Sequence, residues 1–536
     1  MTRGVGARFD RITLAGAACL LAIGASAKSV GPLAQCQSIL VDGVQVCAID
    51  ISVYARGGAA GLPPCPAGVT STGAALLCEQ SFAAAINDAK LYFAAASPPT
   101  QPYLISIPGG TYDFSSQTSA LEQKNGAIDV GGIAPVSAGC LAGSPATTGI
   151  VTLSGNPCLI ISGAGPGQTT LVTANGINGV SGISVSHVMI ENMTIVQPNY
   201  STTQGTYVSQ GTQIIHGMDY STLTIDIAAG FPTPLDLYNL NCASNGSAGC
   251  SPAGLASISN DIYLRAYTND GAPQLIQSTS TQNSNAQLPW GYPSVSQRVI
   301  AAVAPTQPDP ANYPNRWKLT LSPAVSQRQI PTYYSGTTAG VANLICMKVD
   351  HADAFWFNDN SSGGTDVIMN NMVWSGAARG TFRGINGKLG GGGLGAQVYN
   401  SSIERAPAVN GQVPCLSSQS GGMQFGQPSD PPIYGNAVYG LKAVATGDDS
   451  LAMFNDIGGM PTGRGGYYPL TTIAQSVIGN SFARDILMTN EQRKSRMDGN
   501  LPVSVDAATQ AAINADGNCD PLVLGNGNCP VTYVNY

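Results

Sequence analysis

The sequence predicts an all-β protein built from many short strands that are joined by tight turns. Gly and Pro account for 65 and 35 of the 536 residues, and only 10% of the residues are charged. Gly, Asn, Ser and Thr are interspersed among Val and Ile, and charged stretches that favour helices are few. This mixture is typical of short strands separated by turns. The apolar fraction of 43% is ordinary for a globular chain.

The first 27 residues have the three parts of a secretory signal peptide. Arg3, Arg8 and Arg11 form a positively charged start, residues 12–24 form an apolar middle, and Ala-Ser-Ala at 25–27 is a small-residue cleavage signature. The apolar part is too short for a membrane span, and no later apolar run is long enough for one. We therefore expect a secreted or periplasmic protein without a membrane-spanning segment.

The cysteine content agrees with export. One of the thirteen cysteines, Cys19, lies in the signal peptide, and an even number in the remainder fits disulfide bonds. The sequence leaves the pairing open, but four pairs are close enough to close short loops: Cys36 with Cys47, Cys65 with Cys78, Cys242 with Cys250, and Cys519 with Cys529. We predict no metal site, because a C-x-x-C motif is missing and the chain has three histidines.

The charge distribution excludes some partners. The formal net charge is −7, and Lys and Arg form no extended cluster along the chain. Such an acidic chain binds nucleic acids and anionic membranes poorly, so we expect neither as a partner.

One helix is predicted, over residues 81–96. Phe82, Ala85, Ile86, Ala89 and Phe93 recur at helical spacing, and Ser81 is suited to cap the start. An alternating segment, YLISIPGGTYDFSS, follows and predicts a strand that is interrupted at the Pro-Gly-Gly of 108–110.

A repeated unit centred on Asn predicts stacked coils. VMIENMTI, VIMNNMVW, AQVYNSSI, PIYGNAVY and SVIGNSFA share an apolar stretch, an Asn and a further apolar position. The repeated residues are Asn192, Asn371, Asn400, Asn436 and Asn480. Asn tolerates unusual backbone angles at a turn, and its amide can stack on the equivalent amide of the next coil. Four of the units are followed by a second strand, which suits a strand-turn-strand coil with one variable loop.

These features resemble the right-handed parallel β-helix of the pectate-lyase-like superfamily. The helix at 81–96, the segment ISIPGGTYDF and the Asn-centred units carry the resemblance, which covers residues 80–200 and 345–490. The resemblance implies a solenoid with an N-terminal capping helix. From about 207 to 343 the Asn units lapse and longer alternating strands appear, such as STLTIDIAAG, which predicts an inserted all-β subdomain.

The resulting domain prediction has six parts. It comprises a signal peptide (1–27), an N-terminal disulfide-containing segment (28–80), an N-terminal part of the β-helix with its capping helix (81–206), an inserted β subdomain (207–343), a C-terminal part of the β-helix with the candidate active site (344–492), and a C-terminal cap (493–536).

Aligning the second strands predicts a column of residues where these strands begin. Equivalent residues of successive coils are about 4.8 Å apart. The column consists of Asp353, Gly380, Gly421, Asp449 and Arg484, and Asp448, Arg379 and Asp485 are expected in its neighbourhood. The loops before these strands vary in length, and variable loops on a rigid scaffold commonly carry binding sites.

The segment TGDDS places Asp448 and Asp449 where such a loop meets a strand. Two close carboxylates repel, so one can remain protonated near neutral pH, and glycosidic cleavage needs an acid for the leaving oxygen and a base for water. We predict Asp448, Asp449 and Asp485 as catalytic residues, with Asp485 one coil after Asp449 as its partner. The predicted substrate-binding residues are Arg379, Arg383, Glu404, Arg405, Gln424, Arg484, Asp353 and Trp356.

The G-D-D strand also resembles the acid pair of polygalacturonase-like glycoside hydrolases, which invert the anomeric centre. The resemblance implies that Asp449 is the general acid and that Asp448 helps to activate water. That family has a further catalytic Asp about one coil earlier, whereas Asp353 stands several coils away, and its Gly-His-Gly and Arg-x-Lys motifs are missing. The match therefore favours sugar chemistry of this kind over true pectin hydrolysis.

Three functions remain open on the sequence. The first is a secreted glycoside hydrolase that acts on a polysaccharide or oligosaccharide and needs no cofactor. The second is a polysaccharide lyase, in which Asp353, Asp448 or Asp449 would hold Ca²⁺ and Arg383 or Arg484 would act on the proton. The third is a glycan-binding or surface-attachment protein without turnover. Structural alternatives also stand: the acid pair can bond turn amides or a structural cation, and Trp356 can belong to an interior stack.

Overall fold

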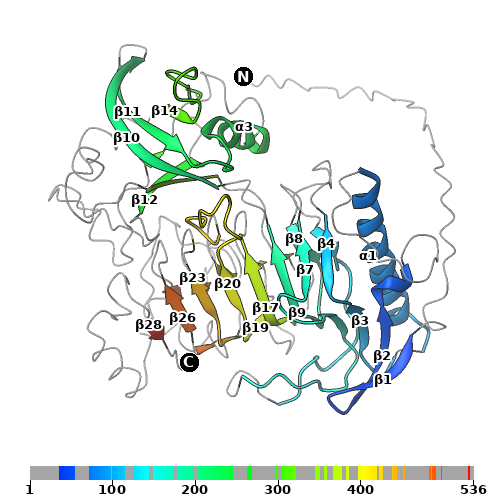
Figure 1. Cartoon of the computed structure of the whole chain (residues 1–536). Helices are drawn as coiled ribbons and strands as arrows, with labels where there is room; N and C mark the ends of the chain where they lie inside the picture. The colour runs from blue at the N-terminus through cyan, green and yellow to red at the C-terminus, as the bar shows by residue number, and fades with distance from the viewer. Residues whose placement is uncertain are drawn as a thin grey trace, which may run out of the picture.

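The structure is a computed structural model. It describes residues 36–54, 72–97, 99–114, 126–143, 149–173, 178–197, 202–215, 218–245, 262–267, 297–298, 303–320, 344–349, 355–358, 366–376, 382–385, 396–418, 422–425, 437–444, 446, 451–453, 482–484, 486–489, 496–497 and 529–531. Strands dominate this part of the chain, and the α-helices described are α1 (Thr72–Phe93) and α3 (Pro234–Asn245) (Figure 1). The predicted all-β class is confirmed.

The largest sheet has fifteen strands. Its main path runs β1-β2-β3-β6-β9-β17-β20-β23-β26-β28, with β4, β7, β19, β22 and β25 joined beside it. The strand bounds are β1 (Gln37–Val41), β2 (Val44–Asp50), β3 (Tyr103–Ile107), β4 (Gly110–Asp113), β6 (Leu159–Gly163), β7 (Thr169–Val172), β9 (Val188–Val196), β17 (Val367–Ser375), β19 (Gln397–Tyr399), β20 (Ser402–Glu404), β22 (Ala437–Tyr439), β23 (Lys442–Val444), β25 (Phe482–Arg484), β26 (Ile486–Thr489) and β28 (Cys529–Val531).

A second sheet has seven strands in the order β27-β24-β21-β18-β16-β8-β5, and each neighbouring pair is parallel. Its strands are β5 (Gly126–Asp129), β8 (Asn178–Ile183), β16 (Phe355–Asn358), β18 (Phe382–Ile385), β21 (Met423–Phe425), β24 (Leu451–Met453) and β27 (Arg496–Met497). The chain alternates between the two sheets, because β16, β18, β21 and β24 come before β17, β19, β22 and β25, respectively. Strands that pair within one sheet are therefore distant from each other in the sequence.

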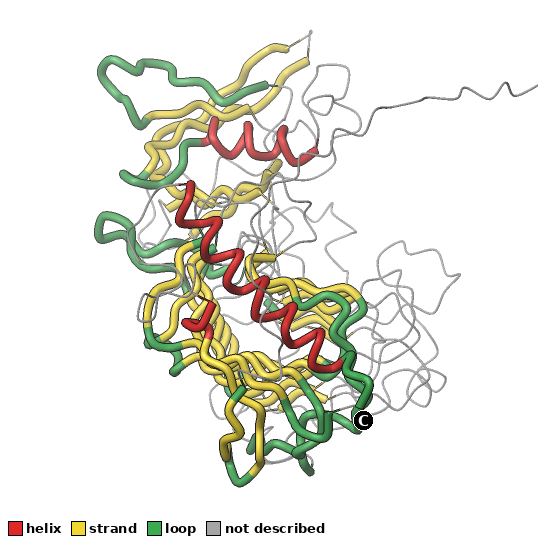
Figure 2. Tube along the Cα trace, turned by 90° about the vertical axis from the view of Figure 1, so that its right-hand side faces the viewer, coloured by secondary structure: helices red, strands yellow, loops and turns green. Residues whose placement is uncertain are grey.

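The main core lies between these two sheets and is closed at one end by α1. Val180 and Met423 of the seven-stranded sheet share one buried cluster with Ile190, Met369 and Val438 of the large sheet. The helix contacts β3, β4 and β5 at the N-terminal end of the stacked strands, and Figure 2 shows it lying across them. Its buried residues in that cluster include Phe82, Ala85, Ile86 and Ala89, as the helical spacing predicts.

The start of the helix differs from the prediction. The helix α1 begins at Thr72, so Ser81 lies inside it instead of capping it. The hydroxyl of Ser81 donates a hydrogen bond to the carbonyl oxygen of Tyr54 at 3.0 Å. The segment AALL at 74–77 explains the difference, because Ala and Leu have high helix propensity and extend the helix toward its N-terminus.

A third, six-stranded sheet interrupts the parallel strands between β9 and β16. Its order is β13-β12-β15-β10-β11-β14, and every strand pair in it is antiparallel. The strands are β10 (Thr202–Ile215), β11 (Met218–Ile227), β12 (Ile262–Tyr267), β13 (Gln297–Arg298), β14 (Arg316–Thr320) and β15 (Leu344–Val349). The helix α3 belongs to the same segment and was not predicted by the sequence pattern.

The Asn residues of these units bend the chain, within β9 and β17 and between β19 and β20. Asn192, Asn371 and Asn400 have φ values of 59°, 51° and 49°, in the left-handed region that Asn tolerates. The Nδ2 atom of Asn371 donates to Oδ1 of Asn192 at 2.8 Å. The predicted bend is therefore confirmed for all three residues, and the contact between equivalent amides is confirmed for Asn192 and Asn371.

Glycine occupies this bend on the next strand of the series. Tyr399 pairs with Tyr439, so Gly440, with φ of 68°, follows at the level of Asn400. Asn436 and Asn480 of the predicted repeat lie outside the described residues. Gly serves at this bend because it adopts positive φ without strain.

The N-terminal hairpin of β1 and β2 carries a disulfide bond between Cys36 and Cys47, one of the pairs that the sequence suggested. Cys415 is also disulfide-bonded. The other suggested pairs involve residues outside the described part. Within the described residues, no helix has both the length and the apolar character needed to cross a membrane.

Candidate functional site

Three predicted substrate-binding residues stand side by side on neighbouring strands of the seven-stranded sheet. Trp356 of β16 pairs with Arg383 of β18, and Arg383 pairs with Gln424 of β21. Adjacent strands in a sheet are about 4.8 Å apart, so the three backbone positions form one short row. We call these positions the Trp-Arg-Gln row.

The row belongs to the strand face opposite the core. The preceding residues on the strands form their own row, in which Val180, Phe355, Phe382 and Met423 pair in register. Val180 and Met423 are fully buried members of the main core. Because successive residues of a strand alternate between faces, the positions of the Trp-Arg-Gln row are those of the outer face.

The register extends the row beyond what the sequence alignment found. Ser181 pairs with Trp356 on one side and with Asp129 beyond it, while Ala452 and then Arg496 follow Gln424 on the other side. Ser181 is buried, and its hydroxyl has no hydrogen-bond partner. The sequence alignment began at Asp353 and ended at Arg484, so it did not include Asp129, Ser181 and Arg496.

Two acids of the predicted site, the substrate-binding Asp353 and the catalytic Asp449, come just before strands of this sheet in the sequence. Asp353 and Asp449 stand two residues before Phe355 and Leu451, which begin β16 and β24. Four residues of this sheet pair in register: Phe355, Phe382, Met423 and Leu451. In the sequence, each stands two residues after a member of the predicted column, namely Asp353, Gly380, Gly421 and Asp449. Asp353, Asp448, Asp449 and Arg379 themselves lie outside the described residues.

The fifth member of the column was wrongly aligned. Arg484 ends β25 and pairs with Tyr439 in the fifteen-stranded sheet. The strand that pairs with β24 is β27, whose Arg496 lies opposite Ala452. The sequence of 482–490 was misread because its apolar alternation is like that of the second strands. Asp485 lies outside the described residues, and its pairing with Asp449 stays a prediction.

Glu404 and Arg405 also belong to the other sheet. Glu404 ends β20, where its Oε1 accepts a hydrogen bond from the Ser402 hydroxyl at 2.9 Å. The carbonyl oxygen of Arg405 accepts a hydrogen bond from the Ser375 hydroxyl at 3.1 Å. They therefore stand at the beginning of the loop that leads to β21, not in the row itself.

That loop, residues 405–418, is fastened to the six-stranded sheet by Gln204 of β10. The side-chain amide of Gln204 donates to the carbonyl oxygen of Val413 at 3.1 Å and accepts from the backbone N–H of Cys415 at 2.7 Å. Gln204 is 2% exposed, so both bonds are shielded from water. Asn410 adds a bond from Nδ2 to the carbonyl oxygen of Ala229 at 2.9 Å.

The fastened loop touches the loop that carries the acid pair. Ser418 forms a parallel bridge with Thr446, and both side chains are buried. Thr446 stands two residues before Asp448 in the sequence. The six-stranded sheet thus supports, through Gln204 and Ser418, the chain immediately before the predicted catalytic acids.

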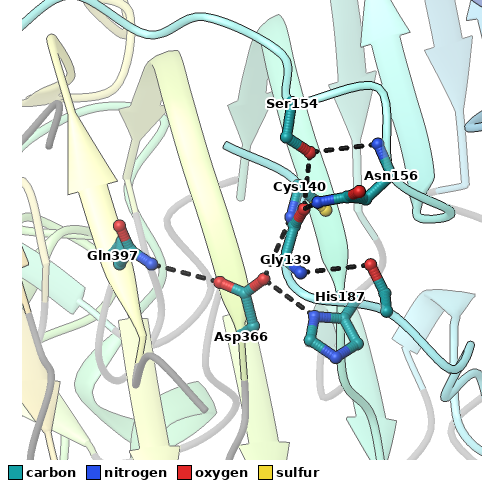
Figure 3. A network of polar contacts seen from close by, with 8 residues as sticks. Gly139, Cys140, Ser154, Asn156, His187, Asp366 and Gln397 are labelled. Carbon is teal, nitrogen blue, oxygen red and sulfur yellow. Dashed lines mark hydrogen bonds and ion pairs between the residues drawn. The ribbon is translucent and has the colours of Figure 1, made fainter. Parts of the chain in front are cut away.

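A separate polar network is centred on one buried carboxylate (Figure 3). Asp366, which precedes β17, accepts bonds from His187 Nδ1 at 2.9 Å, from Gln397 Nε2 at 3.1 Å and from the backbone N–H of Cys140 at 3.3 Å. Asp366 is 1% exposed, so these donors replace the water that a buried carboxylate loses. The network fastens the segment around Cys140 to the large sheet, and we assign it a structural role.

A second carboxylate belongs to the large sheet. Glu191 of β9 accepts bonds from the Ser162 hydroxyl at 3.1 Å and from Asn370 Nδ2 at 3.0 Å. Burial raises the pKa of Glu191 above its ordinary value of 4.5, and these two hydrogen bonds oppose the rise. Among the residues that the structure describes, no group of three or more His, Cys, Asp or Glu is arranged to hold a metal ion.

Comparison with known proteins gives a structural similarity but no match in sequence. No protein-family model and no curated protein sequence matches this chain. Among solved structures, the chain is similar to the A-module of mannuronan C-5 epimerase AlgE4 from Azotobacter vinelandii, with 9% sequence identity and a TM-score of 0.25. The alignment covers 82% of this chain and 70% of that chain.

Proposed function

We propose that this protein is an exported carbohydrate-active enzyme, most simply a glycoside hydrolase, whose polysaccharide or oligosaccharide substrate lies along the outer face of the seven-stranded sheet. We further propose that the alternating sheets are the coils of a right-handed parallel β-helix. The right hand is the one found in nearly all parallel crossover connections.

The observation that carries the proposal is the Trp-Arg-Gln row on the face opposite the core. An aromatic ring offers a face for sugar stacking, and guanidinium and amide groups donate hydrogen bonds to hydroxyl or carboxylate oxygens. Because these three groups stand on neighbouring strands of a parallel sheet, one row can contact successive parts of an extended chain.

The chemistry is assigned to the acid pair before β24. Asp449 acts as the general acid that protonates the leaving oxygen, and Asp448 helps to activate the attacking water, as the resemblance to the G-D-D strand implies. The register supports a place for this pair beside the row, since β24 is the neighbour of β21. Asp353 would be three strand spacings from Asp449, roughly 14 Å, which exceeds the ~6.5–9.5 Å of an inverting pair.

The experiment is to incubate the purified protein with a panel of neutral and acidic polysaccharides, with calcium and with a chelator. A hydrolase releases new reducing ends without ultraviolet absorbance, and chelation leaves its rate unchanged. A lyase produces an unsaturated product that absorbs in the ultraviolet and stops on chelation, which would replace our assignment with Ca²⁺-dependent elimination. Binding without any cleavage across the panel would instead identify a glycan-binding or surface-attachment protein.

A further inference from the structure

We propose that Cys140 and Cys158 are the two halves of a disulfide bond that closes the loop 140–158 over the outer side of the large sheet. In the structure both are free thiols, and both are buried. The proposal is independent of the enzymatic activity proposed above.

The backbone brings the two cysteines together. Leu141 and Leu153 form an antiparallel bridge, and the N–H of Ser154 donates to the carbonyl oxygen of Cys140 at 2.8 Å. The two ends of the loop therefore run antiparallel beside each other. Cys158 follows four residues after Ser154, immediately before β6.

A compact turn between Ser154 and Cys158 brings the chain back toward Cys140. Gly139 accepts two hydrogen bonds at its carbonyl oxygen, from the Ser154 hydroxyl at 2.6 Å and from Asn156 Nδ2 at 3.1 Å. The Ser154 hydroxyl in turn accepts the N–H of Asn156 at 3.1 Å. Figure 3 shows these side chains gathered around Gly139 and Cys140. The turn at 154–156 is thus folded back onto the residue that precedes Cys140.

The thiols themselves are in contact. Both belong to one apolar cluster with Ile160 and Met189, and their exposed fractions are 1% and 0%. The Cys140 side chain is hydrogen-bonded to Cys158; burial, followed by this contact, raises the pKa of Cys140 well above its ordinary value. A protonated, buried thiol is a poor nucleophile, so the bond has to form during folding, while the thiols are still accessible.

The reaction is ordinary thiol–disulfide exchange. Each thiol loses its proton and together the two sulfurs lose two electrons, while a disulfide of an oxidoreductase in the oxidising compartment gains two electrons and two protons to become a dithiol. One sulfur–sulfur bond forms in this protein and one breaks in the oxidant. The export proposed above would supply such a compartment, and this step rests on that proposal. The Cys36–Cys47 bond of the adjacent hairpin is a pair of the same kind.

The bond would add to the contacts that already hold this segment. The N–H of Cys140 donates to Asp366, which precedes β17 of the large sheet, and Asn400 Nδ2 donates to the carbonyl oxygen of Gly149 in the same loop at 2.9 Å. A covalent bond between Cys140 and Cys158, which immediately precedes β6, would attach Cys140 to the large sheet a second time. Closing a loop of this length restricts the unfolded chain and stabilises the folded one.

The test is disulfide mapping of protein exported into an oxidising compartment. The sample is denatured in iodoacetamide without reductant and is digested with a protease that cleaves after Leu, because Leu141 and Leu153 separate the two cysteines and Lys and Arg do not occur between them. We expect a cross-linked peptide pair, two hydrogen atoms lighter than the reduced pair. The Cys36–Cys47 bond in the same digest serves as the control.

Two results would overturn the proposal: recovery of Cys140 and Cys158 as alkylated peptides while Cys36–Cys47 is linked, or linkage of either to another cysteine. A variant pair gives a second measure. Cys140→Ser should leave Cys158 alkylated, and it should lower the unfolding midpoint as far as the double variant Cys140→Ser with Cys158→Ser does. Additive losses in the two single variants would contradict a shared bond. The mapping needs only the natural chain, so it remains decisive if a variant fails to fold.

Discussion

Asn371 donates a hydrogen bond from its Nδ2 to Oδ1 of Asn192 at 2.8 Å, across 179 residues of sequence. Both residues have positive φ and bend their strands, β17 and β9, at the same level. The parallel register of these strands brings the two amides together, so one residue type serves both the bend and the contact between strands.

Replacing Asn371 separates these two contributions. Asn371→Ala loses the hydrogen bond and places a Cβ-bearing residue without a compensating polar group at φ of 51°, whereas Asn371→Gly loses only the bond. We expect losses in the free energy of unfolding of about 2 kcal/mol for Ala and about 1 kcal/mol for Gly. Urea unfolding of the two variants measures the difference, and an Ala variant as stable as the Gly variant would contradict the strain argument.

Glu191 predicts a pH dependence of stability. Its pKa is raised by burial, so between its unfolded and folded pKa values the folded state binds more protons than the unfolded state. The contribution of this group to stability is therefore fully present below the unfolded pKa and is lost as the pH rises through the folded pKa. We expect the stability of the natural protein relative to Glu191→Gln to decline as the pH rises from about 4.5.

The measurement is urea unfolding of both proteins at several pH values between about 4 and 7. Glu404→Gln is the matched control, because Glu404 is also at a strand of the large sheet and is hydrogen-bonded by Ser402. A difference between the natural protein and Glu191→Gln that stays constant, or that grows with pH, would show that burial does not govern this carboxyl group.

Gln204 predicts a local effect on the loop 405–418. Gln204→Ala removes one donor and one acceptor from Val413 and Cys415, which leaves two backbone groups without their partner. We expect a loss of stability of about 1–3 kcal/mol and faster amide hydrogen exchange in the segments around Cys415 and Thr446. Thr212→Ala, at an exposed position of the same strand, is the control. Unchanged exchange in both segments would show that Gln204 does not support the loops.

The sequence predicted the features that repeat along the chain and missed those that depend on a single register. Asn192, Asn371 and Asn400 could be found because a bend at positive φ selects Asn, and the apolar spacing of Phe82 to Ala89 identified the buried face of α1. The bend at Gly440 could not be found from an Asn pattern, since glycine satisfies the same backbone requirement. Arg484 was misplaced because strands of both sheets have similar apolar alternation, and only pairing with Tyr439 distinguishes them.

The Trp-Arg-Gln row predicts the effect of removing its central residue. Arg383→Ala should weaken binding of the substrate polysaccharide about 10- to 100-fold, the loss that corresponds to one or two hydrogen bonds from a charged group. Lys442→Ala, which removes an exposed cation from the large sheet, should leave binding unchanged. Isothermal titration with the substrate found in the panel measures both variants. Equal affinities would exclude Arg383 from the binding surface.

Asp449→Asn tests the central claim most directly, that sugar cleavage depends on an acid beside the outer face of the seven-stranded sheet. The measurement is the turnover rate and the substrate affinity of Asp449→Asn, compared with the natural protein and with Asp42→Asn, which changes an exposed Asp at the N-terminal hairpin. We predict that Asp449→Asn binds the polysaccharide and loses at least about 100-fold in turnover, as expected for a general acid, while Asp42→Asn retains full activity. Turnover by Asp449→Asn at the rate of the natural protein would contradict the proposed mechanism.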